Sequence, residues 1–245
     1  MELRFYMARR LFFVPEVQSE LAELRGEDAK HLTRVLRVEA GQVYELSDGQ
    51  SLYLAQVELA DRDAVRFRVL ERLPTPVDPY EVTLAMALVK FDRFEWILEK
   101  ATELGAHHIR PFWCDRSEPG LEKAALKRIE RWRKILIESS QQSRRVVPPQ
   151  VHEPVNFERV LPVPAERRYF FDERRDDAEF APELVAKTML IIGPEGGWTD
   201  RERALATGCV GAALGPRVLR AETAAMAALA ILGSHLRRTL GSPAS

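Results

Sequence analysis

Beyond residue 80, short apolar runs alternate with longer amphipathic segments, and this alternation limits the fold more than any other feature. The run VTLAMALV at 82–89 is apolar almost throughout, as expected of a strand that is covered on both faces. The segment that follows, DRFEWILEKATELG, places its apolar residues on one side of a helix that ends at Gly105. Strands followed by helices in this order predict an α/β domain with a mainly parallel sheet.

The alternation continues toward the C-terminus and predicts the remaining elements of this domain. We expect a helix at 121–140 and two more that begin at Asp200 and near Ala221. We expect further strands at HIRPFW (108–113), RYFF (168–171), MLII (189–192) and 212–214.

The first 72 residues follow a period of two instead, which is typical of strands with one buried face. VYEL and SLYLAQVEL flank the sequence Ser47-Asp48-Gly49-Gln50, a hairpin signal, and one short helix is expected at Glu27–Leu36. This pattern predicts a small β-barrel, an architecture that often serves as a binding module.

Three prolines separate the two patterns. Pro74, Pro76 and Pro79 indicate a stiff linker, because proline is excluded from central strands and helix interiors. We therefore predict a β-barrel at 1–72, a linker at 73–80 and the α/β domain at 81–245.

Composition and charge exclude several classes of protein. No apolar run approaches the roughly 18 residues of a membrane helix, and the N-terminus lacks the apolar stretch and cleavage site of a signal peptide. We expect a cytoplasmic protein with no membrane partner. The net charge of −1 argues against a protein that coats nucleic acid without specificity.

The two cysteines suggest neither a disulfide framework nor a zinc knuckle, because Cys114 and Cys209 are far apart and outside any CxxC spacing. His107, His108 and Cys114 form one weak metal candidate. A buried strand cysteine beside partly exposed histidines explains them better, so we predict no metal.

A basic stretch runs from Lys123 to Arg145 and holds eight basic residues against two acidic ones. A contact with an RNA backbone would explain it. A solvated helix face explains it equally well, and the stretch alone does not decide between the two.

The most informative loop is GPEGGW at 193–198, which joins the predicted strand 189–192 to a helix opened by a Thr199–Glu202 capping box. Glycines at the carboxyl end of a strand let a ligand approach the backbone. The loop has no GxGxxG and no terminal Lys-Ser/Thr pair, and Glu195 would repel a polyphosphate. The sequence therefore favours a ligand other than a polyphosphate, with a ligand-free tight turn as the alternative.

A second strand end meets Gly215-Pro216 in the stretch ALGPRVLRAETAAMAALAIL at 213–232. The loop carries Arg217 and Arg220 and leads into a helix rich in alanine, which permits close helix packing in the core or across a dimer interface. Core packing is the default interpretation.

These two loops resemble the paired C-terminal motifs of the ribosomal RNA small-subunit methyltransferase E family, which belongs to the SPOUT class. RRLFFV at 9–14, HLTRVLRV at 31–38, EKATELGAHHIRPFWCDRS at 99–117 and QQSRR at 141–145 are also similar to the family, so the resemblance covers nearly the whole chain. The last segment usually begins with Glu in the family, and Gln141 departs from that pattern.

The resemblance implies a trefoil-knotted, mainly parallel α/β sheet, an N-terminal PUA-like barrel that helps hold RNA, and a homodimer. It implies an enzyme that uses S-adenosylmethionine to methylate N3 of a uridine in small-subunit ribosomal RNA, either naked or in an assembled particle. A sulfonium cation tolerates Glu195 better than a phosphate would.

The resemblance also implies which residues form the site. For an RNA substrate, we expect phosphate contacts from the basic stretch 123–145 and the N-terminal arginines, with Arg9, Arg10, Arg144 and Arg145 as the named candidates. The residues implied for the cofactor are Ile192, Gly193, Glu195, Gly196, Gly197, Leu214, Gly215, Val218, Leu219, Thr223 and Ala224.

Methylation at N3 places negative charge on the uridine ring as its proton leaves, and a fixed cation should stabilise that charge. Arg220 is the first candidate, with a salt bridge to Glu222 or a packing role as the alternative. The sequence does not reveal the proton acceptor. Two other classes of protein are disfavoured: intact glycines in both loops argue against a non-catalytic RNA-binding protein, and missing phosphate motifs argue against a nucleotide-using enzyme.

Overall fold

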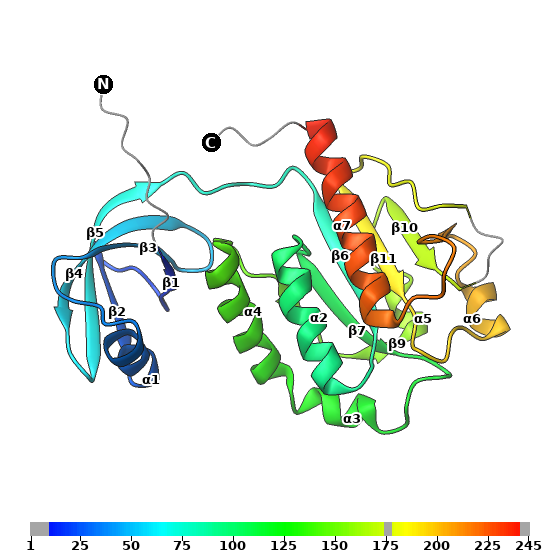
Figure 1. Cartoon of the computed structure of the whole chain (residues 1–245), viewed down its shortest axis with the longest axis horizontal. Coiled ribbons are helices and arrows are strands. Elements are labelled where there is room, and N and C mark those ends of the chain that lie inside the picture. The colour runs from blue at the N-terminus through cyan, green and yellow to red at the C-terminus, as the bar shows by residue number, and fades with distance from the viewer. Residues whose placement is uncertain (1–9, 174–177, 241–245) are drawn as a thin grey trace. The chain divides into compact units, whose positions relative to one another are not determined.

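The computed structural model describes residues 10–173 and 178–240, which fall into two compact units (Figure 1). The N-terminal unit contains Met1–Val77 together with Ser140–Pro148, and the C-terminal unit contains Asp78–Ser139 and Pro149–Ser245. No helix among the described residues is long and apolar enough to cross a bilayer.

Residues 140–148 are the main difference from the predicted domain limits, which placed them in the α/β domain. The Ser47 hydroxyl donates to the Val146 carbonyl (2.7 Å), and Arg144 pairs with the buried carboxylate of Glu45 (2.6 Å). These contacts tie the segment to the N-terminal unit, although the helix that leads into it shows no break in its sequence pattern.

The N-terminal unit is built on a five-stranded sheet with the order β1-β3-β4-β5-β2. Within the described residues this order is open at β1 and β2, so the predicted barrel is a half-barrel. The hairpin turn forms as expected, because Asp48 accepts hydrogen bonds from the backbone of Gln50 and Ser51 while Gly49 adopts a φ of 86°. The strands are β1 Leu11–Phe13, β2 Leu21–Arg25, β3 Val43–Ser47, β4 Leu52–Ala60 and β5 Ala64–Leu73, and the helical segment is α1 Glu27–Lys30 continued as a π-helix over His31–Val35.

The C-terminal unit contains a seven-stranded sheet in which every pairing is parallel, as predicted. The order is β12-β10-β11-β6-β7-β8, and β9 also pairs with β7. The strands are β6 Glu81–Ala87, β7 His108–Trp113, β8 Gln150–Val151, β9 Val155–Asn156, β10 Arg167–Phe171, β11 Lys187–Ile192 and β12 Val210–Ala212.

Helices cover both faces of this sheet, which explains why its central strands are mainly apolar. Leu84 and Met86 of β6 pack with α2, α4 and α7, while Ala85 and Ala87 pack with α5 and α6 on the opposite face. In Figure 1, α2 and α7 lie alongside each other across the first of these faces. The helices are α2 Phe91–Glu103, α3 Leu121–Leu126, α4 Ile129–Ser143, α5 Phe157–Val160, α6 Asp200–Leu205 and α7 Ala221–Leu240.

Two predicted elements differ in their limits. The single helix expected at 121–140 is interrupted because the amides of Lys127 and Arg128 bond to carbonyls only three residues back, which ends α3 in a tight turn. The last strand was placed two residues too late, since β12 ends at Ala212.

Candidate functional site

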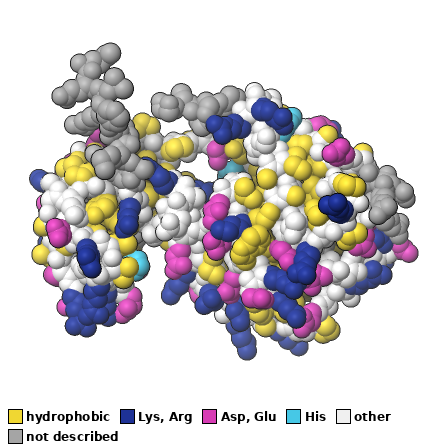
Figure 2. Space-filling view, in the orientation of Figure 1, with side chains coloured by type: hydrophobic (Ala, Val, Ile, Leu, Met, Phe, Trp, Pro, Cys, Tyr) yellow, Lys and Arg dark blue, Asp and Glu magenta, His cyan; other side chains and the backbone are white. Residues whose placement is uncertain are grey.

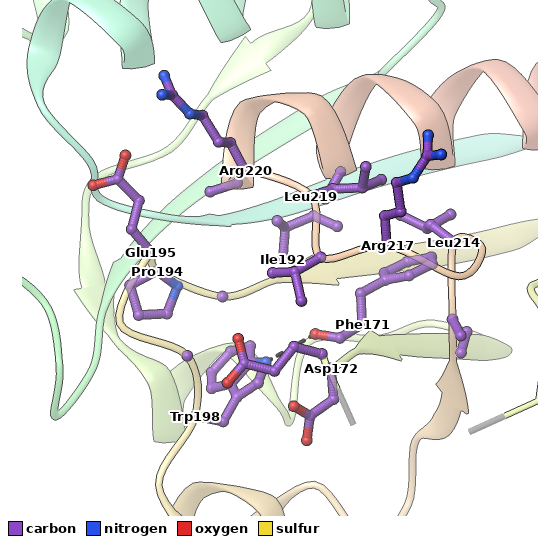
Figure 3. Close-up of a pocket in the computed structure, with 18 of the residues that line it drawn as sticks. Phe171, Asp172, Ile192, Pro194, Glu195, Trp198, Leu214, Arg217, Leu219 and Arg220 are labelled. Carbon is purple, nitrogen blue, oxygen red and sulfur yellow. Dashed lines mark hydrogen bonds between the residues drawn. The ribbon is translucent and has the colours of Figure 1, made fainter. Parts of the chain in front are cut away.

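A cavity of about 470 Å³ opens at the carboxyl ends of three neighbouring strands, β12, β10 and β11 (Figure 3). Its walls come from the loop after β11, from the segment 212–221 that follows β12, and from the residues that end β10. Both glycine-containing loops noted in the sequence therefore meet at one site. The carboxyl edge of a parallel sheet is the usual ligand position in such folds.

The loop after β11 is fixed by the start of α6, the helix that follows it. Thr199 and Glu202 form the predicted capping box of α6, and the buried Glu202 carboxylate also accepts from the backbone of Asp115 (2.8 Å). The buried Trp198 donates its indole N–H to the Phe171 carbonyl (2.9 Å), which fixes the loop to β10. The loop is therefore anchored at its C-terminal end.

Two glycines in this loop have no room for a side chain. A Cβ at Gly193 would lie 2.6 Å from the Trp198 ring, and a Cβ at Gly197 would lie 2.6 Å from a carboxylate oxygen of Glu173. Gly197 also has a φ of 68°, which side-chain-bearing residues rarely adopt. Both residues line the cavity, so no side chain separates the loop backbone from a bound ligand at these two positions.

The segment after β12 forms the opposite wall. Gly215 has a φ of 105°, and the chain then passes through Val218, which is 72% exposed, to the start of α7. Leu214 and Leu219 add apolar surface beside Ile192 of β11. This side of the cavity therefore combines apolar side chains with exposed backbone.

The charged groups around the cavity differ in their partners. Glu195 pairs with Arg93 of α2, and Asp172 binds Arg203 through two hydrogen bonds of 2.5 and 3.1 Å. The guanidinium of Arg220 has no hydrogen-bond or ion-pair partner in the described part of the chain. In Figure 3, Arg220 extends away from Ile192, on the side opposite Asp172.

Most of the residues predicted for the cofactor line this cavity, and Arg220 lies at its rim. Two do not: Gly196 is exposed and its carbonyl accepts from Arg116 (2.8 Å), while Thr223 is exposed on α7. The predicted residues that line the cavity are Ile192, Gly193, Glu195, Gly197, Leu214, Gly215, Val218, Leu219 and Ala224.

The sequence prediction missed the residues that the neighbouring elements contribute. The end of β10 and the two positions after it contribute Phe171, Asp172 and Glu173. The first turn of α2 contributes Arg93, and the buried Trp198 also lines the cavity. The position of β10 between β11 and β12 explains its contribution. A search for polar residues at the end of every parallel strand would have found Asp172 and Glu173.

The candidate RNA-binding arginines have different environments. Arg10 is exposed, and Arg9 lies outside the described residues. Arg144 is bound to Glu45, and Arg145 donates to the Val147 carbonyl (2.9 Å). Arg144 therefore has a structural role within the N-terminal unit, because it compensates the buried charge of Glu45.

The candidate metal ligands point to other partners. His107 contacts Asp78 (3.0 Å), His108 contacts His152 (3.1 Å), and the Cys114 thiol contacts Ser117 (3.5 Å). Burial raises the pKa of the Cys114 thiol to about 11, so the sulfur stays protonated at neutral pH, and a thiol is a poor metal ligand.

Comparisons with known proteins agree with this architecture. The sequence matches the model of an RNA methyltransferase domain over residues 76–233 and of an RNA methyltransferase PUA domain over residues 24–70. The ribosomal RNA small subunit methyltransferase E of Aquifex aeolicus is 31% identical over 91% of this chain and 98% of its own. The protein of the same name from Synechocystis sp. is 35% identical over 95% of this chain and 79% of its own.

Solved structures show the same likeness in three dimensions. The ribosomal RNA small subunit methyltransferase E of Neisseria gonorrhoeae, bound to S-adenosyl methionine, matches with a TM-score of 0.83 and 27% identity, covering 93% of this chain and 98% of that one. A methyltransferase of Legionella pneumophila in complex with the same cofactor matches with a TM-score of 0.82 and 30% identity, covering 94% and 98%. The chain therefore belongs to the ribosomal RNA small subunit methyltransferase E family.

Proposed function

We propose that this protein is an enzyme that uses S-adenosylmethionine to methylate N3 of a uridine in small-subunit ribosomal RNA. The observation that carries the proposal is the cavity walled by the two glycine-containing loops, in a fold whose relative from Neisseria gonorrhoeae is bound to that cofactor. We also propose that the enzyme acts in the cytoplasm, which is consistent with a ribosomal RNA substrate. The matched PUA domain supports a role of the N-terminal unit in holding RNA, with Arg10 and Arg145 as candidate contacts.

The residues of the cavity fit this cofactor better than a polyphosphate. A volume of about 470 Å³ lies in the range of small-molecule sites, and Ile192, Leu214 and Leu219 offer apolar walls for an adenine ring. The lining holds three carboxylates and three arginines, so it has no net positive charge to attract a polyphosphate; these residues are Asp172, Glu173, Glu195, Arg93, Arg217 and Arg220. The absence of side chains at Gly193 and Gly197 lets the cofactor approach the loop backbone, although the Gly197 amide itself donates to the Pro194 carbonyl (2.9 Å).

S-adenosylmethionine supplies an electrophilic methyl group when bound, so the protein must orient the uridine and stabilise its charge. Loss of the N3 proton spreads negative charge onto O2 and O4 of the ring. Arg220 is exposed at the cavity rim, where its free side chain can turn toward such a base. The alternative salt bridge does not form, because the buried Oε2 of Glu222 has no hydrogen-bond partner among the described residues.

Thermal shift with four ligands tests the proposed cofactor. S-adenosylmethionine and S-adenosylhomocysteine should raise the unfolding midpoint, because a ligand that binds only the folded state stabilises it. At 100 times Kd the stabilisation is about 2.7 kcal/mol, which is several degrees for a chain of this size. ATP and NAD should leave the midpoint unchanged. Stabilisation by ATP or NAD alone would overturn the proposal in favour of a nucleotide-using enzyme.

The homodimer and the trefoil knot are part of the same proposal. The helices α2 and α7 pack against each other, and each exposes a large apolar side chain, Trp96 (44%) and Ile231 (38%), which supports association through this face. Ala225 and Ala228 of α7 are instead buried inside the unit. A crystal structure that traces residues 189–230 would show whether the chain is threaded as a knot.

Light scattering on the intact protein tests the dimer, and a monomer mass at micromolar concentration would contradict it. Deletion of residues 1–72 is a poor test, because it would remove Ser47 and Glu45, which bind Val146 and Arg144. The intact chain avoids that artefact.

A further inference from the structure

A second cavity lies in the C-terminal unit, between the first turn of α2 and the helices α3 and α4. Its volume is about 570 Å³, and its lining combines Phe91 and Ala124 with four cations. No carboxylate is among the residues that line it. We call this the basic groove and define it by its cations, which are Lys123, Lys127, Arg128 and Arg131.

Two of these cations are held in fixed positions. Arg128 and Arg131 both bind the Glu95 carboxylate, with distances of 2.8 to 2.9 Å, and the Arg128 guanidinium lies 4.4 Å from the centre of the Phe91 ring. The hydrogen bond from Arg131, with the nearby charge of both arginines, lowers the pKa of Glu95, so this carboxylate stays ionised. The two arginines therefore form a preorganised wall.

The other two cations are unpaired. Lys123 and Lys127 are exposed, four residues apart along α3 and its C-terminal cap, and form no ion pair in the ranges 10–173 and 178–240. Figure 2 shows dark-blue side chains gathered on the lower part of the C-terminal unit, where Figure 1 places α3. In a helix face that is only solvated, there is no need for two arginines to be held in place beside two unpaired lysines. The combination of fixed arginines and free lysines therefore favours a ligand-binding site over a solvated face.

Two chain segments lead from the cofactor cavity to the groove. Phe91 lines the groove while Arg93, in the same turn of α2, lines the cavity and pairs with Glu195. On the other side, Arg116 holds the Gly196 carbonyl, and the same loop continues to Gly120 at the groove. The groove therefore lies along segments that adjoin the cavity, where a strand that flanks a bound nucleotide could pass.

We infer that the basic groove binds phosphates of the RNA strand that flanks the target uridine, an inference that rests on the proposed function. Lysine is a compact point charge suited to phosphate oxygens, and successive phosphates of one strand match a row of cations better than a single small anion does. The groove thus recognises backbone and carries no base specificity.

The double variant Lys123→Gln with Lys127→Gln tests this inference. Each lost phosphate contact should reduce the slope of log affinity against log salt by about 0.7, so the double variant should lose about 1.4. At 0.1 M salt this corresponds to a loss of roughly 25-fold in affinity for small-subunit RNA. S-adenosylhomocysteine affinity, measured by calorimetry, should stay at the wild-type value because neither lysine lines the cofactor cavity.

Two comparison variants separate specific contacts from overall charge. Arg237→Gln with Arg238→Gln removes the same charge at the exposed end of α7 and should bind RNA almost normally. Lys123→Arg with Lys127→Arg keeps the charge and should retain most of the affinity. Equal losses in the glutamine variants of α3 and α7 would overturn the inference, because overall charge would then explain the effect.

Other outcomes are equally decisive. If wild-type protein methylates RNA and the α3 variant binds RNA normally, the inference fails while the proposed function stands. If wild-type protein neither binds nor methylates small-subunit RNA, both fail together. A change from dimer to monomer in the α3 variant would assign the groove to a second copy of this chain instead.

Discussion

Replacing Arg220 with alanine is expected to reduce methyl transfer by about 10²- to 10³-fold at saturating RNA, the usual cost of removing a donor that stabilises developing charge in the transition state. Arg220 lies at the rim of the cofactor cavity and has no ion-pair partner in the described part of the chain. Its loss should therefore leave the fold and S-adenosylhomocysteine affinity unchanged. Single-turnover assays with saturating RNA measure the chemical step directly.

A matched control is Arg238→Ala, which removes one arginine from the exposed end of α7, far along the helix from the cavity. This variant should transfer methyl groups at the wild-type rate. If Arg220→Ala also transferred at a near-normal rate, Arg220 would be a structural residue. The electrophilic group would then be sought at Arg217 and Arg93, which line the cavity, and at Arg9 and Arg10.

Replacing Gly197 with valine should lower S-adenosylhomocysteine affinity by at least 100-fold. The new Cβ would lie 2.6 Å from the Glu173 carboxylate, and the φ of 68° is strongly disfavoured for a β-branched residue. The Glu173 side chain can move away, but the valine cannot relieve the strained φ without a change in the loop backbone, and its side chain would occupy the wall that faces the cavity. Calorimetry gives the affinity, and circular dichroism shows whether the variant is folded.

Gly208→Val provides the control for this substitution. A Cβ at Gly208 meets no atom within 4 Å, and Gly208 does not line the cavity. The control should bind S-adenosylhomocysteine normally. A folded Gly197→Val protein with wild-type affinity would show that the loop after β11 is not part of the binding site.

The parts of the site that local sequence encodes were predictable. The Thr199–Glu202 capping box marks the start of α6, and Gly105, with a φ of 88°, ends α2, because these are interactions between residues a few positions apart. The sequence favours a ligand at the loop 193–198, and the family resemblance adds the loop 213–220 to the same predicted site. Their meeting at one cavity follows from parallel strands that share a carboxyl edge.

The remaining features depend on contacts between distant segments. Asp172 and Glu173 reach the cavity because β10 lies between β11 and β12, and sheet order is not written in any local pattern. Arg93 and Glu195 are 102 positions apart, so no local pattern predicts that the charge of Glu195 is compensated. Half of the basic stretch is likewise paired, with Glu95, Glu130 and Glu45 as the partners.

The motif resemblance predicts two cofactor residues that do not line the cavity in the structure. Thr223 and Gly196 lie next to cavity residues in the chain, but one is exposed on the surface of α7 and the other turns toward Arg116. Adjacent residues in a loop or helix point in different directions, so a motif identifies the segment and the fold selects the side chains.

Methyl transfer to small-subunit ribosomal RNA tests the central claim most directly. The intact protein is incubated with methyl-labelled S-adenosylmethionine and either naked RNA or small-subunit particles, and the RNA is then digested to nucleosides for mass spectrometry. The account predicts label in 3-methyluridine, at a rate that falls about 10²-fold or more in Arg220→Ala. Label in another nucleoside, or no transfer to either substrate by a protein that binds S-adenosylhomocysteine, would contradict it.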